Sequence, residues 1–206
     1  NLALTVQAIT DHLKDSKDRS VGVVASEAAR AAILGARGNC GMMLSQFLLG
    51  FARNLEGRDR INARDFGTAL GAGVENLYGS LEDPVEGTIV TVMRDTADAV
   101  SQTETRDIAT LIEFMLESAR CSLDRTPDLL PVLKSAGVVD AGGKGFVSLL
   151  EGVSLFLRGE PLSQNPRAES SVGTPVLGAV EYPDKVEQYR FCTEALVRGD
   201  KLPTQD

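Results

Sequence analysis

Small and polar residues gather at three places in this sequence, each directly ahead of an apolar helical pattern. The three stretches are GARGNCGMMLSQ at 35–46, DPVEGTIVTVMRD at 83–95 and SAGVVDAGGKGF at 135–146. A glycine-rich helix start presents unpaired backbone N–H groups and the positive end of the helix dipole, and both suit an anion such as phosphate. Glycine also lets the backbone approach a bulky anion closely because it has no Cβ.

The tetrapeptide Gly38-Asn39-Cys40-Gly41 has the form of a phosphate-binding turn, in which the Asn39 amide adds a donor. Arg37 can contact a phosphate or pair with a neighbouring acid. The alternative is a tight turn between helices, with Thr88 and Asp140 acting as ordinary N-caps of later helices. Three such helix starts in one small domain favour a shared polar site, provided that antiparallel packing gathers them at one end.

Cysteine usage indicates a reducing compartment. The three cysteines, at positions 40, 121 and 192, form neither a CxxC pair nor a disulfide framework, so a cytoplasmic location is expected. Cys40 lies at a predicted helix N-terminus, where a thiol can have a lowered pKa and become oxidisable. We take a reactive Cys40 as a hypothesis for the structure to test.

Apolar residues recur at helical spacing along most of the chain, with no strand pattern between the stripes. Asn62 is expected to cap one helix, with Asp65 in its first turn. Short turns favour antiparallel neighbours, so the sequence predicts about eight antiparallel amphipathic helices. The expected helices fall within 2–13, 20–34, 44–55, 61–77, 89–100, 108–119 and 146–157, with a short one opened by Thr126-Pro127.

The helical pattern stops near Arg158, which predicts a division of the chain. Residues 1–158 form the helical domain, and residues 159–181 have the proline- and glycine-rich composition of a linker. Polar and apolar residues then alternate at strand period from Tyr189. Residues 182–206 are therefore expected to begin a second, β-containing domain that is truncated here.

Charge and hydropathy exclude two classes of partner. The 29 acidic and 21 basic residues give a net charge of -8, which repels nucleic acid and anionic lipid. No apolar run approaches the roughly 20 residues that cross a bilayer, so no membrane insertion is expected.

The three opening stretches, in this order and at these separations, resemble the nucleotide-binding domain of the DhaL type, named for the dihydroxyacetone kinase L subunit. They are most similar to its version in the fatty acid kinase A subunit of bacteria. The resemblance covers residues 1 to 158, and YRFCTEALVRG at 189–199 resembles the start of that subunit's middle domain. It implies a closed barrel of eight antiparallel helices that binds ATP at one end.

The resemblance also implies a set of site residues. Residues 38–41 would form the loop over the ATP phosphates, and Asn1 would match the asparagine that closes the family's metal-binding turn. The family holds two magnesium ions with an aspartate cluster, which is expected upstream of Asn1, so no metal ligands are expected in this chain and it should be inactive alone. The implied nucleotide-binding residues are Asn1, Gly38, Asn39, Cys40, Gly41, Thr88, Asp140, Ala141 and Gly142.

The predicted function is the ATP-binding domain of a kinase that phosphorylates a fatty acid carboxylate presented by a DegV-type binding protein. Two alternatives stay open at this point. One is a dihydroxyacetone-type kinase subunit, and the other is a non-catalytic, nucleotide-binding adaptor. The sequence also leaves a homodimer open.

Overall fold

A computed structural model describes residues 1–160 of the chain, and within them every regular element is a helix. The all-helical prediction is therefore confirmed for this part of the molecule. Most of the predicted linker and the predicted start of a β-containing domain lie outside the described residues. The eight helices are α1 (Leu2–Leu13), α2 (Val21–Gly35), α3 (Gly38–Asn54), α4 (Ala63–Gly79), α5 (Ile89–Ser101), α6 (Ile108–Leu129), α7 (Pro131–Ala136) and α8 (Ala141–Leu157).

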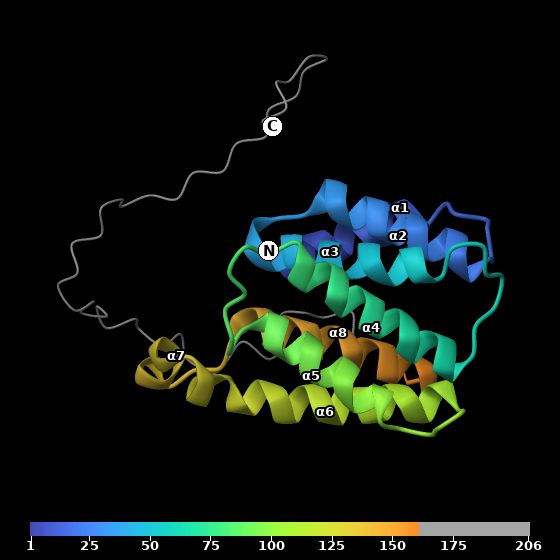
Figure 1. The fold of residues 1–206 in the computed structure, drawn as a ribbon. Helices are drawn as coiled ribbons and strands as arrows, with labels where there is room; N and C mark the ends of the chain where they lie inside the picture. Colours follow the sequence, from blue (N-terminus) through green and yellow to red (C-terminus); the bar gives the residue numbers. More distant parts are fainter. Residues whose placement is uncertain (161–206) are drawn as a thin grey trace, which may run out of the picture. The chain divides into compact units, whose positions relative to one another are not determined.

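Helices that follow one another in sequence pack side by side in alternating directions from α1 to α6 (Figure 1). The helix α8 packs against α5 and α6, and it also contacts α1. An ideal Cβ on Gly145 would lie 2.7 Å from Cδ2 of Leu2, which shows how closely these two helices approach. The last helix therefore meets the first one, as in a closed barrel.

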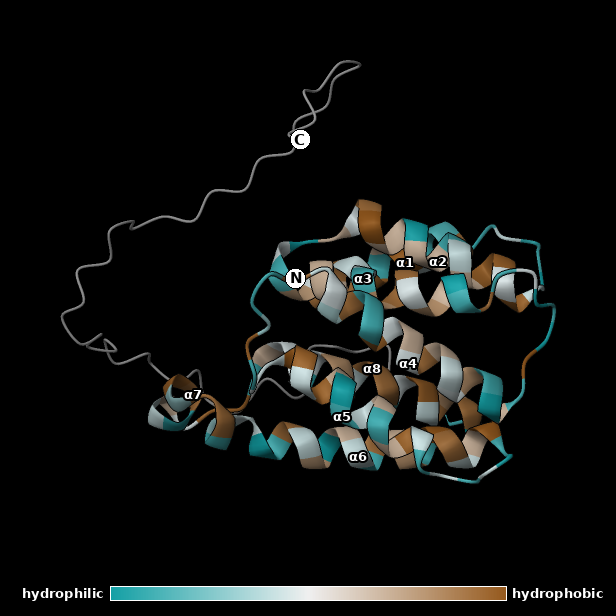
Figure 2. Ribbon diagram, viewed as in Figure 1, coloured by the Kyte–Doolittle hydropathy of each residue, from teal (hydrophilic) through white to brown (hydrophobic). Residues whose placement is uncertain are grey.

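The core lies along the inward faces of α3 to α6 and α8. Figure 2 shows that these helices carry both apolar and polar residues along their length, as amphipathic helices do. Burying one large aliphatic side chain stabilises a fold by about 1.5–3 kcal/mol, so the core stabilises the helices that position the site. Its most completely buried large side chains include Leu44, Leu77, Ile89, Met93, Leu111 and Met115.

The helices α3 and α4 approach closely because each contributes a glycine to their crossing. A Cβ on Gly50 would lie 2.5 Å from Cβ of Asn76 and closer still to the carbonyl oxygen of Ala72. A Cβ on Gly73 would lie 2.9 Å from a ring carbon of Phe47. No side chain fits at either position without moving a neighbouring helix.

The predicted helix start at Thr126-Pro127 is wrong, because α6 continues through both residues to Leu129. A proline inside a helix leaves the carbonyl four residues earlier without its amide donor. Here that carbonyl belongs to Leu123, and the Thr126 hydroxyl donates to it at 2.7 Å. The side chain thus replaces the missing backbone bond, and the short helix α7 begins later, at Pro131.

Candidate nucleotide site

Four helix N-termini lie together at one end of the helical domain, at the left in Figure 1. A Cβ on Gly38 of α3 would be 2.5 Å from Nδ2 of Asn1, which precedes α1. A Cβ on Gly142 of α8 would be 2.8 Å from Sγ of Cys40 and 3.1 Å from Cβ of Ile89, the first residue of α5. The residues singled out in the sequence therefore meet in space, as antiparallel packing required.

The helix α3 begins at Gly38 itself, so residues 38–41 form its first turn and not a loop ahead of it. Gly38 has a φ of 59°, a value that suits glycine and that turns the chain sharply into the helix. The hydroxyl of the fully buried Thr5 accepts the Arg37 amide at 3.3 Å and fixes the entry to the helix. Within residues 1–160, the amides of Asn39 and Cys40 donate to no acceptor.

Thr88 and Asp140 act as N-caps, which was the alternative left open by the sequence. The Thr88 hydroxyl donates to the Val85 carbonyl at 2.7 Å and accepts the Val90 amide at 3.4 Å. Oδ2 of Asp140 accepts the Gly143 amide at 2.7 Å. Capping satisfies one donor of each helix start, and the first-turn amides of Ala141 and Gly142 find no acceptor among the described residues.

Asn1 and Arg37 flank the start of α3. Asn1 is the N-cap residue of α1, although its side chain makes no capping bond. The exposed Arg37 guanidinium donates to the carbonyl of the preceding Ala36 at 2.8 Å and forms no ion pair within residues 1–160. Its role as a phosphate contact stays a prediction, as do the binding roles of the other site residues.

The hypothesis of a lowered Cys40 pKa is wrong. Burial of the half-buried thiol raises its pKa, and the negative charge of Asp140 raises it further. Both effects favour the neutral thiol and outweigh the backbone hydrogen bond, which lowers the pKa of Cys40. The structure therefore describes Cys40 as a packing residue between α3 and α8 and not as a reactive thiolate.

Slow alkylation of Cys40 is the expected consequence. Treatment of the folded protein with iodoacetamide near neutral pH, followed by peptide mass spectrometry, should label Cys40 several-fold more slowly than the exposed Cys121. The rate at Cys40 should rise only at a pH above the usual range for a thiol, since its pKa is raised. In urea the two sites should react alike, and fast labelling of Cys40 in the folded protein would contradict the structure.

The described residues do not fit a magnesium site. Residues 1–160 contain no group of three or more histidine, cysteine, aspartate or glutamate side chains that could hold a metal ion. Beside Gly142 the carboxylate of Asp140 already accepts the Gly143 amide. Mg²⁺ requires several oxygen ligands in near-octahedral geometry, and one capping carboxylate does not supply them.

Two buried threonines support the site in a role that the sequence did not predict. Thr5 anchors the start of α3, and the hydroxyl of Thr126 accepts the Asp140 amide at 3.1 Å, next to the start of α8. Each side chain is fully buried, at 0% exposure. The available signal was a threonine within an apolar helical stripe, where a hydroxyl needs a partner.

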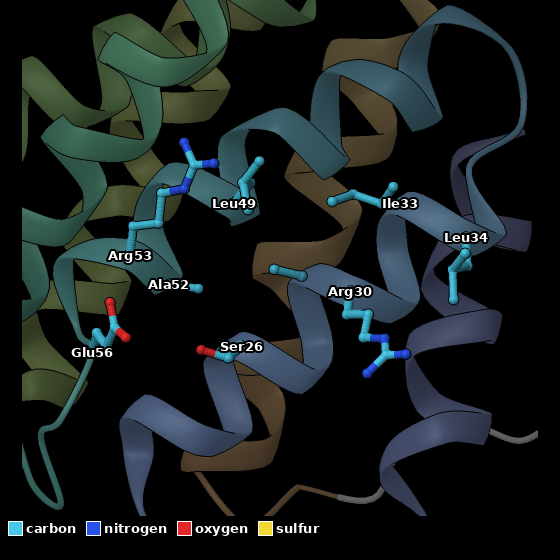
Figure 3. A pocket seen from close by; sticks show the side chains of 9 residues that line it. Ser26, Arg30, Ile33, Leu34, Leu49, Ala52, Arg53 and Glu56 are labelled. Atoms are coloured by element: carbon cyan, nitrogen blue, oxygen red, sulfur yellow. The ribbon is translucent and has the colours of Figure 1, made fainter. Parts of the chain in front are cut away.

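A separate hollow of about 290 Å³ lies between α2 and α3, and none of the predicted site residues lines it. Figure 3 shows Ile33 and Leu49 beside the gap between the two helices. The Arg30 and Arg53 side chains extend away from each other in this view, and Arg53 donates to Asn76 of α4 at 3.2 Å. The two arginines therefore do not converge on the hollow, and the helix starts are the better candidate site.

Within the described residues, no helix has the length and apolar character needed to cross a membrane.

Residues 1–160 thus form an antiparallel helical domain in which several glycine-rich helix starts lie at one end. Free backbone amides are concentrated at that end. The family model described as "DAK2 domain" matches residues 1–155, and the chain belongs to this family of DhaL-type domains. The family is kinase-related, and its domains generally bind nucleotide. This membership confirms the likeness of the three sequence stretches to a DhaL-type domain.

Similar proteins occur in species of Staphylococcus and Bacillus. The chain is 40% identical over 208 residues to "Uncharacterized protein SSP1546" of Staphylococcus saprophyticus and 40% identical over 209 residues to "Protein YloV" of Bacillus subtilis. It is 39% identical over 210 residues to "Uncharacterized protein SERP0792" of Staphylococcus epidermidis. Each comparison covers 98% of this chain and 37% of the relative, so the chain spans little more than a third of these proteins.

Proposed function

We propose that the helical domain binds the phosphates of an adenine nucleotide where α1, α3, α5 and α8 begin. The observation that carries this proposal is the meeting of Gly142 with Cys40 and Ile89, which brings three helix N-termini to one point. Each helix N-terminus carries the equivalent of roughly half a positive charge, so three of them attract a polyphosphate together. The unpaired amides of α3 and α8 supply the hydrogen bonds.

Local dipoles matter here because the chain as a whole repels anions. Its net charge is -8, so long-range attraction does not bring a nucleotide to the site. Affinity then depends on the geometry of the first helical turns, where Gly38 and Gly142 let the helix starts approach one another closely.

We infer further that the bound ATP is a phosphoryl donor and that the acceptor is a fatty acid carboxylate presented by a DegV-type binding protein. Support comes from the kinase-related family and from the likeness of DPVEGTIVTVMRD and YRFCTEALVRG to the fatty acid kinase A subunit. Phosphoryl transfer asks a protein mainly for positioning and charge stabilisation. The described residues offer the free amides at the starts of α3 and α8 for this positioning.

A nucleotide-binding adaptor without transferase activity is the second candidate. One observation favours it, namely that no cluster of metal ligands occurs within residues 1–160. ATP consumption by the full-length protein distinguishes the candidates when carrier-bound fatty acid and dihydroxyacetone are offered in separate reactions. Turnover with the first supports our proposal, turnover with the second indicates a dihydroxyacetone-type kinase, and turnover with neither indicates an adaptor.

Direct binding is the primary test of the proposed site. Isothermal titration calorimetry of the protein with ADP should show one site per chain, and a version extended upstream of Asn1 should show a further gain in affinity with Mg²⁺. Nuclear magnetic resonance shifts on ADP addition should be concentrated in the amides of residues 38–41 and 141–142. Shifts that instead cluster around the hollow between α2 and α3 would contradict the proposal.

A further inference from the structure

A buried threonine ties the segment before α5 to the helix itself. The Thr91 hydroxyl donates to Oε2 of Glu86 at 2.7 Å and accepts the Gly87 amide at 2.8 Å. Gly87 has a φ of 81°, and a Cβ there would lie 2.8 Å from Cβ of Leu130. The backbone that leads into Thr88 is therefore held from both sides.

Arg94, one turn further along α5, holds the same carboxylate from outside. Its Nη1 donates to Oε1 of Glu86 and to the Tyr78 hydroxyl at 3.1 Å, while its Nη2 donates to Asp95 at 3.0 Å. Tyr78 comes from the end of α4 and also donates to Glu86 at 3.3 Å. The Glu86 carboxylate thus has three donors from two helices.

The network continues into α6, which fixes the position of the arginine. Oδ2 of Asp95 accepts the Ser122 hydroxyl at 2.7 Å and the Arg125 guanidinium at 2.9 Å. An isolated ion pair as exposed as Arg94–Glu86, at 34% and 45%, contributes little to stability. Arg94 is held by several partners at once, so it can still fix the position of the Glu86 charge even though the ion pair adds little stability.

Glu86 is ionised at neutral pH in this setting. Burial opposes its charge, but the hydrogen bonds from Thr91 and Arg94 outweigh burial and lower its pKa. This negative charge lies two residues before Thr88, at a helix start where we place an anion. Without a cation to hold it, such a carboxylate repels phosphate.

We propose that Arg94 is a positioning residue of the nucleotide site, which neutralises Glu86 and holds its carboxylate against α5 and the end of α4. This inference rests on the proposed function. It explains why a kinase-related domain tolerates an acidic residue directly before the Gly87-Thr88 helix start. The arginine itself need not touch the nucleotide, because it acts through Glu86 and the Thr91 hydroxyl.

The test compares ADP affinity in four proteins by calorimetry, with thermal melts alongside. Arg94→Met should weaken ADP binding about tenfold, the size expected for one uncompensated charge near an anion. Adding Glu86→Gln to that variant should restore most of the affinity, because the amide keeps the shape and removes the charge. Arg120→Met, which breaks the Arg120–Glu151 pair between α6 and α8, is the matched control and should leave affinity unchanged.

The outcomes separate the two proposals. If the wild-type protein does not bind ADP, the proposed function fails. If it binds and Arg94→Met binds equally well, or if Glu86→Gln restores nothing, the positioning role is overturned. If Arg94→Met does not fold, Arg94→Lys takes its place, because lysine keeps the positive charge but lacks the planar guanidinium. Arg94→Lys should weaken ADP binding by less than about tenfold. Unchanged ADP affinity in this variant would overturn the positioning role.

Discussion

Gly142→Ala is expected to weaken ADP binding about ten- to a hundredfold, because its Cβ would enter the point where three helix starts meet. The added carbon would lie 2.8 Å from Sγ of Cys40, 3.1 Å from Oδ2 of Asp140 and 3.1 Å from Cβ of Ile89. Overpacking of this kind costs about 1–3 kcal/mol, and each 1.4 kcal/mol corresponds to about tenfold in affinity. Calorimetric titration with ADP measures the loss.

Gly152→Ala in the same helix is the control for Gly142→Ala. A Cβ at Gly152 meets nothing within 4 Å, so alanine there should raise the free energy of unfolding by about 0.5–1 kcal/mol and leave ADP affinity unchanged. Equal ADP affinity in the two variants would show that the nucleotide does not depend on the packing of the α8 start against α3 and α5.

Local signals explain why most of the fold could be predicted. Asn62 accepts the Asp65 amide at 2.9 Å, and Asp65 accepts the Asn62 amide at 3.2 Å, so the predicted cap is a complete capping box. Such signals lie within four residues of one another, and the apolar stripes likewise depend on one helix at a time. The order of antiparallel helices then follows from short connections.

The errors arose where the placement of a side chain, or a residue distant in sequence, decides a local structure. The helix α6 passes Pro127 because the Thr126 hydroxyl occupies the freed carbonyl, a compensation that depends on side-chain placement and not on spacing. Cys40 has a raised pKa because α8 covers it and brings Asp140 near, fully 100 positions later in the sequence. A sequence pattern records the helix start but not the neighbours that bury it.

The location of the candidate site could be predicted because it consists of helix starts, which local sequence signals indicate. Glycines that precede helical stripes indicate helix starts, and alternating direction places those of α1, α3 and α5 at one end. The six-residue α7 does not cross the domain, so α8 starts at that end as well (Figure 1). The sequence did not indicate that Arg94 would hold Glu86, since the two lie on different elements and the arginine resembles any exposed polar residue. Helix starts can be predicted from neighbouring residues in the sequence, whereas the pairing of charged side chains depends on how the helices pack.

The crossing of α3 and α4 provides the strongest expected effect on stability. Gly50→Ala should lower the free energy of unfolding by about 1–3 kcal/mol, because the methyl group would press against the Ala72 carbonyl and Asn76 of the neighbouring helix. A Cβ at Gly71 on α4 would meet nothing within 4 Å, so Gly71→Ala should instead raise the free energy of unfolding by about 0.5–1 kcal/mol. Urea unfolding of both variants measures the difference. A Gly50→Ala protein as stable as the Gly71→Ala protein would mean that α3 and α4 separate easily and that glycine is not required where they cross.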